Sequence, residues 1–184
     1  MQALLLIDIQ KGIQETGYYG DERNNPGAEE NCTKILTAFR LKNWPVYHVQ
    51  HCSTNLESPL HPTKPTHDFY PGIAPRNGEP IIQKNVNSAF IGTNLKEQLE
   101  HNRITNVVIV GLTTEHCIST STRMAANLGF IVTLISDATA AFNKTGIDGQ
   151  KIEAELVHTI ELANLKDEFA TIKDTASLLQ QLQD

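Results

Sequence analysis

Three residues of this sequence have side chains that could together carry out nucleophilic catalysis. Asp8 follows a continuous apolar run, Lys84 closes a short apolar segment, and Cys117 stands shortly after a third apolar run. A cysteine can attack a carbonyl carbon, a carboxylate can take up the thiol proton, and an ammonium can stabilise the thiolate. Each residue alone also has a plain explanation: a loop cap, a surface lysine and a small core residue. Their combination predicts a cysteine nucleophile with Asp8 as its acid–base partner, if the fold brings the three together.

The segment around Cys117 suggests how the thiol would be activated. An apolar strand breaks at Gly111, and a helix is expected to begin near Cys117. A thiol in the first turn of a helix feels the positive end of the helix dipole, which lowers its pKa and favours the thiolate. His116 is a poorer candidate for the base than Asp8, because adjacent residues of a helix do not face each other. We therefore expect His116 to line the pocket and not to act as the base.

Strand and helix patterns alternate along the chain, and they predict the fold that must position these residues. The expected strands are 3–7, 45–50, 81–84, 106–111, 130–135 and 169–172. The expected helices are 28–42, 94–102 with Asn94 as a cap, 117–128, 149–163 and a short last helix capped by Asp174. This succession predicts an α/β fold: a doubly wound, mostly parallel six-stranded sheet with helices on both faces, in a single domain spanning residues 1–184.

Sheets of this kind bind ligands at the carboxyl ends of their strands. Polar residues are expected there at five places: Asp8, His51, Lys84, the turn 111–117 and Asp137. The long connection 52–79 is rich in proline and is expected to lack regular structure. The strand-end rule therefore predicts one cleft that contains Asp8, Lys84 and Cys117.

Composition excludes several classes of function. The 184 residues carry a formal net charge of −6, and their basic residues are scattered, which argues against a nucleic-acid partner or an anionic membrane surface. The apolar runs are too short to span a membrane, and no basic segment precedes the first of them, so no signal peptide is expected. Cys32, Cys52 and Cys117 are too few for a disulfide framework and indicate a reducing cytoplasm. Cys32 is expected in the core.

No metal or cofactor motif accompanies the candidate site. The seven histidines form no H-E-x-x-H pattern, and no C-x-x-C pair occurs. A glycine-rich dinucleotide motif, a Walker sequence and the G-x-S-x-G elbow of serine hydrolases are also absent from the sequence. We therefore expect no cofactor and no metal, and a small molecule as the substrate.

Several segments resemble the isochorismatase-like cysteine hydrolases, the superfamily that includes nicotinamidases and N-carbamoylsarcosine amidases. They are LLIDIQ at 5–10, QKNVNSAF at 83–90, GLTTEHC at 111–117, TRMAANLGF at 122–130 and SDA at 136–138. These motifs stand in the order found in the family and extend the similarity over about residues 3–142. The resemblance implies the isochorismatase-like form of the predicted fold, a Rossmann-like three-layer sandwich.

The resemblance also implies a mechanism. Asp8, Lys84 and Cys117 would form the catalytic triad, and the substrate would pass through a thioester on the cysteine. The N–H groups of Thr113 and Cys117 would form an oxyanion hole, after a cis peptide bond between Leu112 and Thr113. The family further implies a homo-oligomer, a dimer or larger.

Further residues of these motifs are candidates for binding the substrate. They are Asn87, Phe90 and His116. Their predicted role is to line the pocket around the nucleophile.

Two departures from family patterns narrow the expected activity. Nicotinamidases hold a metal with an Asp-x-His pair after the second strand, where this chain has His51, Cys52 and Ser53. Isochorismatases proper cleave a vinyl ether and lack the cysteine. We therefore expect a metal-independent hydrolase that cleaves a C–N bond of a small amide, imide or carbamoyl compound.

Three alternatives stay open from the sequence. A metal-assisted, nicotinamidase-like amidase would lose its activity to a chelator. A non-catalytic metabolite-binding protein would keep the fold without turnover, although it would have no need of a nucleophile. A phosphoacceptor signalling domain lacks the second acidic residue expected beside Asp8.

Overall fold

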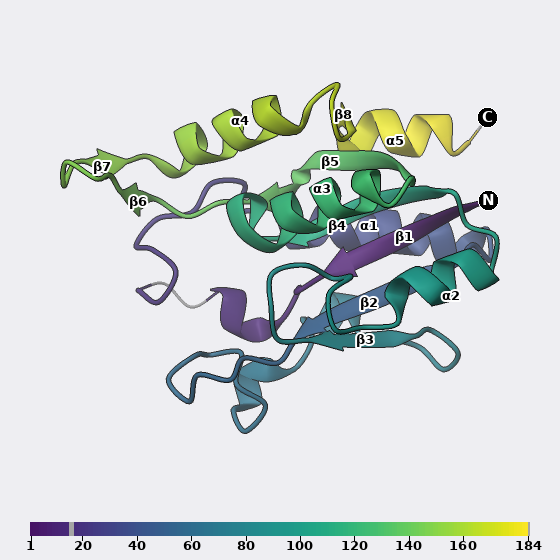
Figure 1. Cartoon of the computed structure of the whole chain (residues 1–184), viewed down its shortest axis with the longest axis horizontal. Coiled ribbons are helices and arrows are strands. Elements are labelled where there is room, and N and C mark those ends of the chain that lie inside the picture. Colours follow the sequence, from purple (N-terminus) through teal and green to yellow (C-terminus); the bar gives the residue numbers. More distant parts are fainter. Residues whose placement is uncertain (15–16, 184) are drawn as a thin grey trace.

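A single six-stranded parallel sheet forms the centre of the molecule (Figure 1). The structure is a computed structural model that describes residues 1–14 and 17–183. The strands are β1 (Gln2–Ile7), β2 (Val46–His51), β3 (Ile81–Lys84), β4 (Asn106–Leu112), β5 (Ile131–Ala140) and β8 (Thr171–Lys173). Their order is β3-β2-β1-β4-β5-β8, and every neighbouring pair is parallel. The predicted doubly wound α/β sheet is thereby confirmed, and its switch point lies between β1 and β4.

Helices cover both faces of the sheet. They are α1 (Ala28–Leu41), α2 (Leu95–His101), α3 (Ser119–Asn127), α4 (Ala154–Leu165) and α5 (Thr175–Gln181). Buried side chains of α2, α3 and α4 join one apolar cluster with the sheet, and those of α1 and α5 join a second cluster on the opposite face. The central strands β1 and β4 are continuously apolar because both of their faces are covered.

The fifth strand is longer than its sequence indicates, so the expectation that Asp137 stands at a strand end beside the site is wrong. A bulge between Ile109 and Gly111 shifts the pairing register, so that β5 continues beside β4 as far as Ala140. Asp137 consequently lies within the strand, not at its end. Its carboxylate accepts hydrogen bonds from the backbone N–H and the hydroxyl of Thr175 at the start of α5. Asp137 therefore holds a helix and does not belong to the site.

Other element boundaries also differ from the prediction. The helix expected at 149–163 begins at Ala154, because a small antiparallel hairpin, β6 (Lys144–Thr145) with β7 (Lys151–Ile152), precedes it. This hairpin projects from the end of the molecule where the strands finish (Figure 1). Asn94 occupies the cap position of α2 without making a capping hydrogen bond, whereas the Asp174 carboxylate accepts a hydrogen bond from Ser177 N–H, as a cap does.

The proline-rich connection 52–79 folds back over the ends of β1 and β2. It contains only two short 3₁₀ turns, Pro65–His67 and Pro71–Ile73, among its described elements. The buried Gln10 side chain holds this connection in place. Its amide group donates hydrogen bonds to the carbonyls of His51 (3.2 Å) and His67 (2.8 Å). The connection is thereby held beside the carboxyl ends of the strands. Within 1–14 and 17–183, no helix is long and apolar enough to cross a membrane.

Candidate active site

The three residues singled out from the sequence meet at the carboxyl ends of β1, β3 and β4. Lys84 Nζ lies 2.6 Å from Asp8 Oδ2 and 3.3 Å from Cys117 Sγ. Asp8 is 1% exposed and Lys84 is 4% exposed, so both charges of this ion pair are removed from water. The ammonium thus bridges the carboxylate and the sulfur, which is the convergence that the strand-end rule predicted.

Asp8 is held in an unusual backbone conformation at the end of β1. Its φ is +54°, in the left-handed region that aspartate tolerates better than most residues, and its N–H donates to Val49 O at 2.9 Å. One carboxylate oxygen, Oδ2, accepts from Lys84. The other oxygen, Oδ1, is buried and has no hydrogen-bond partner among the described residues. A buried acceptor without a partner is unusual and is suited to receiving a proton.

Lys84 makes more contacts than a surface lysine would. Besides Asp8 and Cys117, its ammonium lies 3.1 Å from His51 Nδ1 and 3.2 Å from Val86 O. Burial alone would lower the pKa of Lys84, but the Asp8 carboxylate and the hydrogen bonds to Asp8 and Cys117 outweigh it, and the pKa is raised. Burial lowers the pKa of His51, and the neighbouring Lys84 charge acts in the same direction. Lys84 therefore stays charged beside a neutral His51.

The same geometry tests whether the site could hold a metal ion. Three potential ligand atoms lie within 4.8 Å of one another, one each from Asp8, His51 and Cys117. The Lys84 ammonium, however, already lies within hydrogen-bond distance of all three residues. A divalent cation among them would be placed against a fixed positive charge. These residues therefore do not fit a metal, and the arrangement fits an ammonium instead.

Cys117 lies in a π turn, not in the first turn of an α-helix. The turn spans Thr114–Ile118, and α3 starts only at Ser119. The Thr113 carbonyl accepts hydrogen bonds from the N–H groups of His116 and Ile118, each at 3.2 Å. Single π turns of this kind are frequent at functional sites. The peptide bond between Leu112 and Thr113 is cis.

A buried polar network supports this turn from behind. The Thr114 hydroxyl donates to the Thr139 hydroxyl at 3.0 Å and lies 2.8 Å from His158 Nδ1. Asn25 Nδ2 lies 3.3 Å from the other ring nitrogen of His158. The network joins β5 and α4 to the first residue of the turn, so it fixes where Cys117 stands.

The electrostatics of Cys117 differ from the sequence-based prediction. Burial raises the pKa of the thiol, and the Asp8 charge raises it further, while Lys84 acts in the opposite direction. The expectation of a lowered pKa was wrong because it considered the helix dipole and left out burial and the carboxylate. The thiol is therefore protonated at rest, and a base must remove its proton when it reacts.

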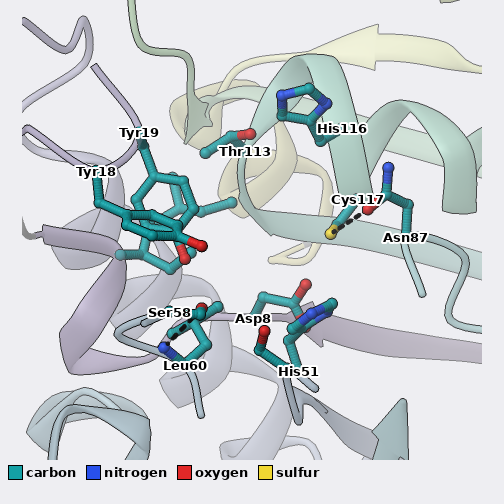
Figure 2. Close-up of a pocket in the computed structure, with 13 residues that line it drawn as sticks. Asp8, Tyr18, Tyr19, His51, Ser58, Leu60, Asn87, Thr113, His116 and Cys117 are labelled. Carbon is teal, nitrogen blue, oxygen red and sulfur yellow. Dashed lines mark hydrogen bonds between the residues drawn. The ribbon is translucent and has the colours of Figure 1, made fainter. Parts of the chain in front are cut away.

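A cavity of about 310 Å³ opens onto the sulfur (Figure 2). Asp8, Thr113 and Cys117 line it, and so do the predicted pocket residues Asn87 and His116. The Cys117 thiol is directed at Asn87 Oδ1, 3.8 Å away, and His116 Nε2 lies 3.4 Å from Lys144 Nζ.

Phe90 was wrongly assigned to the pocket. Its ring stacks against Phe130, with the ring centroids 6.1 Å apart, and it packs on the apolar core. Phe90 is absent from the described residues that line the cavity. The ring therefore supports the core beneath the site.

Sequence reasoning missed the wall of the cavity opposite the sulfur. The rings of Tyr18 and Tyr19 lie there (Figure 2), and Ile13, Leu60 and Leu112 are further apolar residues that line the cavity. The two tyrosines follow Gly17, whose φ of +94° turns the chain, and they come from a stretch that has no strand or helix pattern. Leu60 lies in the proline-rich connection, and no signal in the sequence indicates that it folds onto the site. His51 was placed at a strand end, but its contact with Lys84 was not foreseen.

Comparison with known proteins places the chain in a family. The family model of the isochorismatase domain matches residues 2–177. The uncharacterized isochorismatase family protein YrdC of Bacillus subtilis is 48% identical, over 97% of this chain and 94% of that protein. N-carbamoylsarcosine amidase of Arthrobacter sp. is 31% identical, over 70% of this chain and 55% of the amidase.

Solved structures agree with this assignment. The crystal structure of a hydrolase of the isochorismatase family from Chromobacterium violaceum has a TM-score of 0.94 and 38% sequence identity, and covers 99% of this chain and 93% of its own. The fold and the site define an α/β protein with a half-buried cysteine, a buried lysine and a buried aspartate at its strand ends. The chain belongs to the isochorismatase family and is a hydrolase of that family.

Proposed function

We propose that this chain is a metal-independent cysteine hydrolase, which cleaves a C–N bond of a small amide, imide or carbamoyl compound through a thioester on Cys117. The observation that carries the proposal is the Lys84 ammonium, which bridges Asp8 and Cys117, while the second Asp8 oxygen has no hydrogen-bond partner in the described part of the chain. One relative, the N-carbamoylsarcosine amidase of Arthrobacter sp., has a name that states an activity on a carbamoyl compound, which supports this class of substrate.

In the first half of the reaction the sulfur replaces nitrogen on the carbonyl carbon. Asp8 Oδ1 takes the thiol proton as the sulfur attacks, and the electrons of the C=O double bond move to oxygen. The N–H groups of Thr113 and Cys117 are the proposed donors to this oxyanion. When the C=O bond forms again, the C–N bond breaks, and Asp8 gives its proton to the departing nitrogen. The product is ammonia or an amine, with the acyl group held as a thioester.

In the second half water replaces the sulfur. Asp8, again a carboxylate, takes a proton from water as the water oxygen attacks the thioester carbon. The carbon–sulfur bond then breaks, and the sulfur regains its proton. Lys84 keeps its charge throughout, because its raised pKa favours the ammonium, and it stabilises the sulfur while that atom carries negative charge. The raised pKa of the resting thiol makes the Asp8 base necessary.

Ammonia release from a panel of small primary amides, ureas and carbamoyl compounds tests the proposal. We expect release by the native chain in the presence of a strong chelator, and none by the Cys117→Ala variant. Cys52→Ala is the matched control, because Cys52 is a second, half-buried thiol outside the proposed mechanism. Activity that persists in Cys117→Ala would contradict the nucleophile, and activity lost to the chelator would favour the metal-assisted alternative.

A further inference from the structure

The cavity has two chemically different ends. Asp8, Asn87 and Cys117 form the reactive end. Across from the sulfur, Figure 2 shows the rings of Tyr18 and Tyr19, and below them in this view Leu60 next to Ser58. Together with Ile13 and Leu112, the two tyrosines and Leu60 form what we term the apolar wall. Three of its members, Ile13, Leu60 and Leu112, belong to a buried apolar cluster, Tyr19 packs against this cluster, and Tyr18 is exposed.

The charges near the cavity are already paired. Asp8 is the one Asp or Glu among the described lining residues, and none of these is a lysine or an arginine. The Lys84 ammonium lies 2.6 Å from Asp8, and the Lys144 ammonium at the rim lies 2.8 Å from a carboxylate oxygen of Glu115. Among the described lining residues, the cavity therefore offers a ligand no uncommitted lysine or arginine charge.

We propose that the substrate is an uncharged amide whose non-reacting end is an aromatic or short aliphatic group, and that amides carrying a carboxylate are rejected. This inference rests on the proposed function. A substrate carboxylate placed opposite the sulfur would lose its hydration against the apolar wall. It would find no lysine or arginine counter-ion among the described lining residues, and the negative charge of Asp8 would repel it. A neutral ring or short chain would bury apolar surface at the same place. The volume, about 310 Å³, is at the small end for ligand pockets and suits a single ring.

The hydroxyl groups in the cavity do not change this conclusion. The Tyr18 hydroxyl accepts a hydrogen bond from Asn55 Nδ2 at 3.4 Å, and the Ser58 hydroxyl accepts one from the Leu60 N–H at 3.2 Å. Such hydroxyls can bond to a neutral polar substituent, but they do not neutralise a buried charge. A nitro or ether group is therefore compatible with this end, and a carboxylate is not.

Pairs of amides that match in shape and differ in charge test the inference. One pair is para-nitrobenzamide and para-carbamoylbenzoate, and a second is hexanamide and adipamate. We expect ammonia release to favour the neutral member of at least one pair by about 100-fold or more in kcat/KM. Equal rates within the pairs, or faster cleavage of the anions, would overturn the inference.

Binding to the Cys117→Ala variant separates this inference from the proposed function. This variant cannot form the thioester, so a shift of its thermal midpoint reports binding alone. We expect the neutral amides to raise the midpoint and the anions to leave it unchanged at equal concentration. Neutral binding without turnover by the native chain would uphold the charge preference and contradict the hydrolase. No shift by any of the four compounds, or a larger shift by the anions, would contradict the charge preference.

A charge placed in the apolar wall provides a second, independent check. Leu60→Arg puts a cation opposite the sulfur, and Leu60→Met keeps the position neutral and similar in volume. In variants that fold, as judged by circular dichroism, we expect Leu60→Arg to reduce the preference for para-nitrobenzamide over para-carbamoylbenzoate by about 10-fold or more. Leu60→Met is expected to retain it. An unchanged preference in a folded Leu60→Arg variant would contradict the role of the wall.

Discussion

Asp8 and Lys84 act on the Cys117 thiol in opposite directions. The carboxylate raises the pKa of the thiol and the ammonium lowers it, while burial, the largest influence, raises it. The resting sulfur is consequently a poor nucleophile toward simple alkylating agents, although the base for its activation lies within the same cluster. Reactivity toward an alkylating agent and hydrolytic activity should therefore respond differently to changes at Asp8.

The Asp8→Asn variant separates these two properties. Removing the negative charge lowers the thiol pKa, so we expect iodoacetamide to label Cys117 faster near neutral pH. Hydrolysis of the best amide should fall by about 100-fold or more, because the proton acceptor is lost. Peptide mass spectrometry compares the labelling of Cys117 in the native chain and in the variant; Cys52 is not a neutral reference, because the Asp8 charge also raises its pKa. Slower labelling of Cys117 in this variant would show that the Asp8 charge does not act as described.

Lys84→Met tests what the buried ion pair contributes to folding. Asp8 would remain buried without its cation, which typically costs about 3–5 kcal/mol in the free energy of unfolding. The matched control is Lys11→Met, whose exposed partner is Asp68 at 3.0 Å, and which should change stability by less than about 0.5 kcal/mol. Urea denaturation measures both variants, and equal losses would contradict the buried character of the pair.

At the scale of single residues, the sequence was informative where chemistry restricts residue type. Asp8, Lys84 and Cys117 could be chosen because each stands at or shortly after the end of an apolar strand. The members of the apolar wall could not, since leucines and tyrosines in irregular loops have no pattern that predicts where the loop folds. Phe90 was misplaced because neighbouring residues of one loop can point either to the cavity or to the core.

Gly111 determines how closely two central strands approach near the site. Its φ is +131°, and a β-carbon at this position would lie 2.0 Å from the backbone oxygen of Ile7. That oxygen belongs to the residue directly before Asp8. The same glycine marks the bulge at which β5 shifts its register against β4. A side chain here would therefore displace the end of β1 and the strand that leads to Cys117.

We expect Gly111→Ala to unfold the protein or to abolish its activity, because the contact involves backbone atoms that cannot move aside. Gly27→Ala is the matched control: its φ is not positive, and a β-carbon there meets no atom within 4 Å. The control should keep its thermal midpoint and its activity. A folded and active Gly111→Ala variant would contradict the close approach of the two strands.

At the scale of elements, apolar runs identified the six strands, since strands buried on both faces have a distinctive composition. The ends of elements were less predictable. The π turn that carries Cys117 depends on hydrogen bonds to the Thr113 carbonyl, and the extension of β5 depends on the bulge near Gly111. Both are set by tertiary packing, so local sequence patterns do not reveal them.

The stability of the whole molecule should depend on pH because four histidines are partly or fully buried. Burial lowers the pKa of His48, His51, His67 and His158 below the ordinary value of 6.5. Below that pH the unfolded chain binds protons that the folded chain does not, so the stability present at higher pH is lost as the pH falls. Glu79 affects the stability at lower pH. Its pKa is lowered to about 2, so the stability that its carboxylate contributes is lost as the pH falls from 4.5 toward that value.

Urea denaturation at pH 8 and pH 5.5 should give a lower midpoint at the acidic pH. His48→Gln can keep a hydrogen bond to the Glu79 carboxylate, which the native ring nitrogen contacts at 2.8 Å, and it cannot titrate. We expect the variant to lose less stability than the native chain between the two pH values. A midpoint that rises on acidification would contradict the sign of these shifts.

Some properties of the whole molecule stay predictions from the sequence. The doubly wound sheet could be inferred from the alternation of elements, because few topologies join parallel strands through helices. The homo-oligomer, the cytoplasmic location and the single domain over residues 1–184 depend on information beyond one chain's fold. They remain expectations that the resemblance and the composition support.

The nucleophilic role of Cys117 is tested most directly by trapping it with nitriles. A catalytic thiol adds across the C≡N bond, so that sulfur bonds to carbon and the thiol proton moves to nitrogen. We would treat the native chain with hexanenitrile or para-nitrobenzonitrile and locate the adduct by peptide mass spectrometry. We expect an adduct on Cys117 that forms faster than any on the half-buried Cys52, and that is lost in Asp8→Asn. An adduct that favours Cys52, or one on Cys117 that does not depend on Asp8, would contradict this expectation.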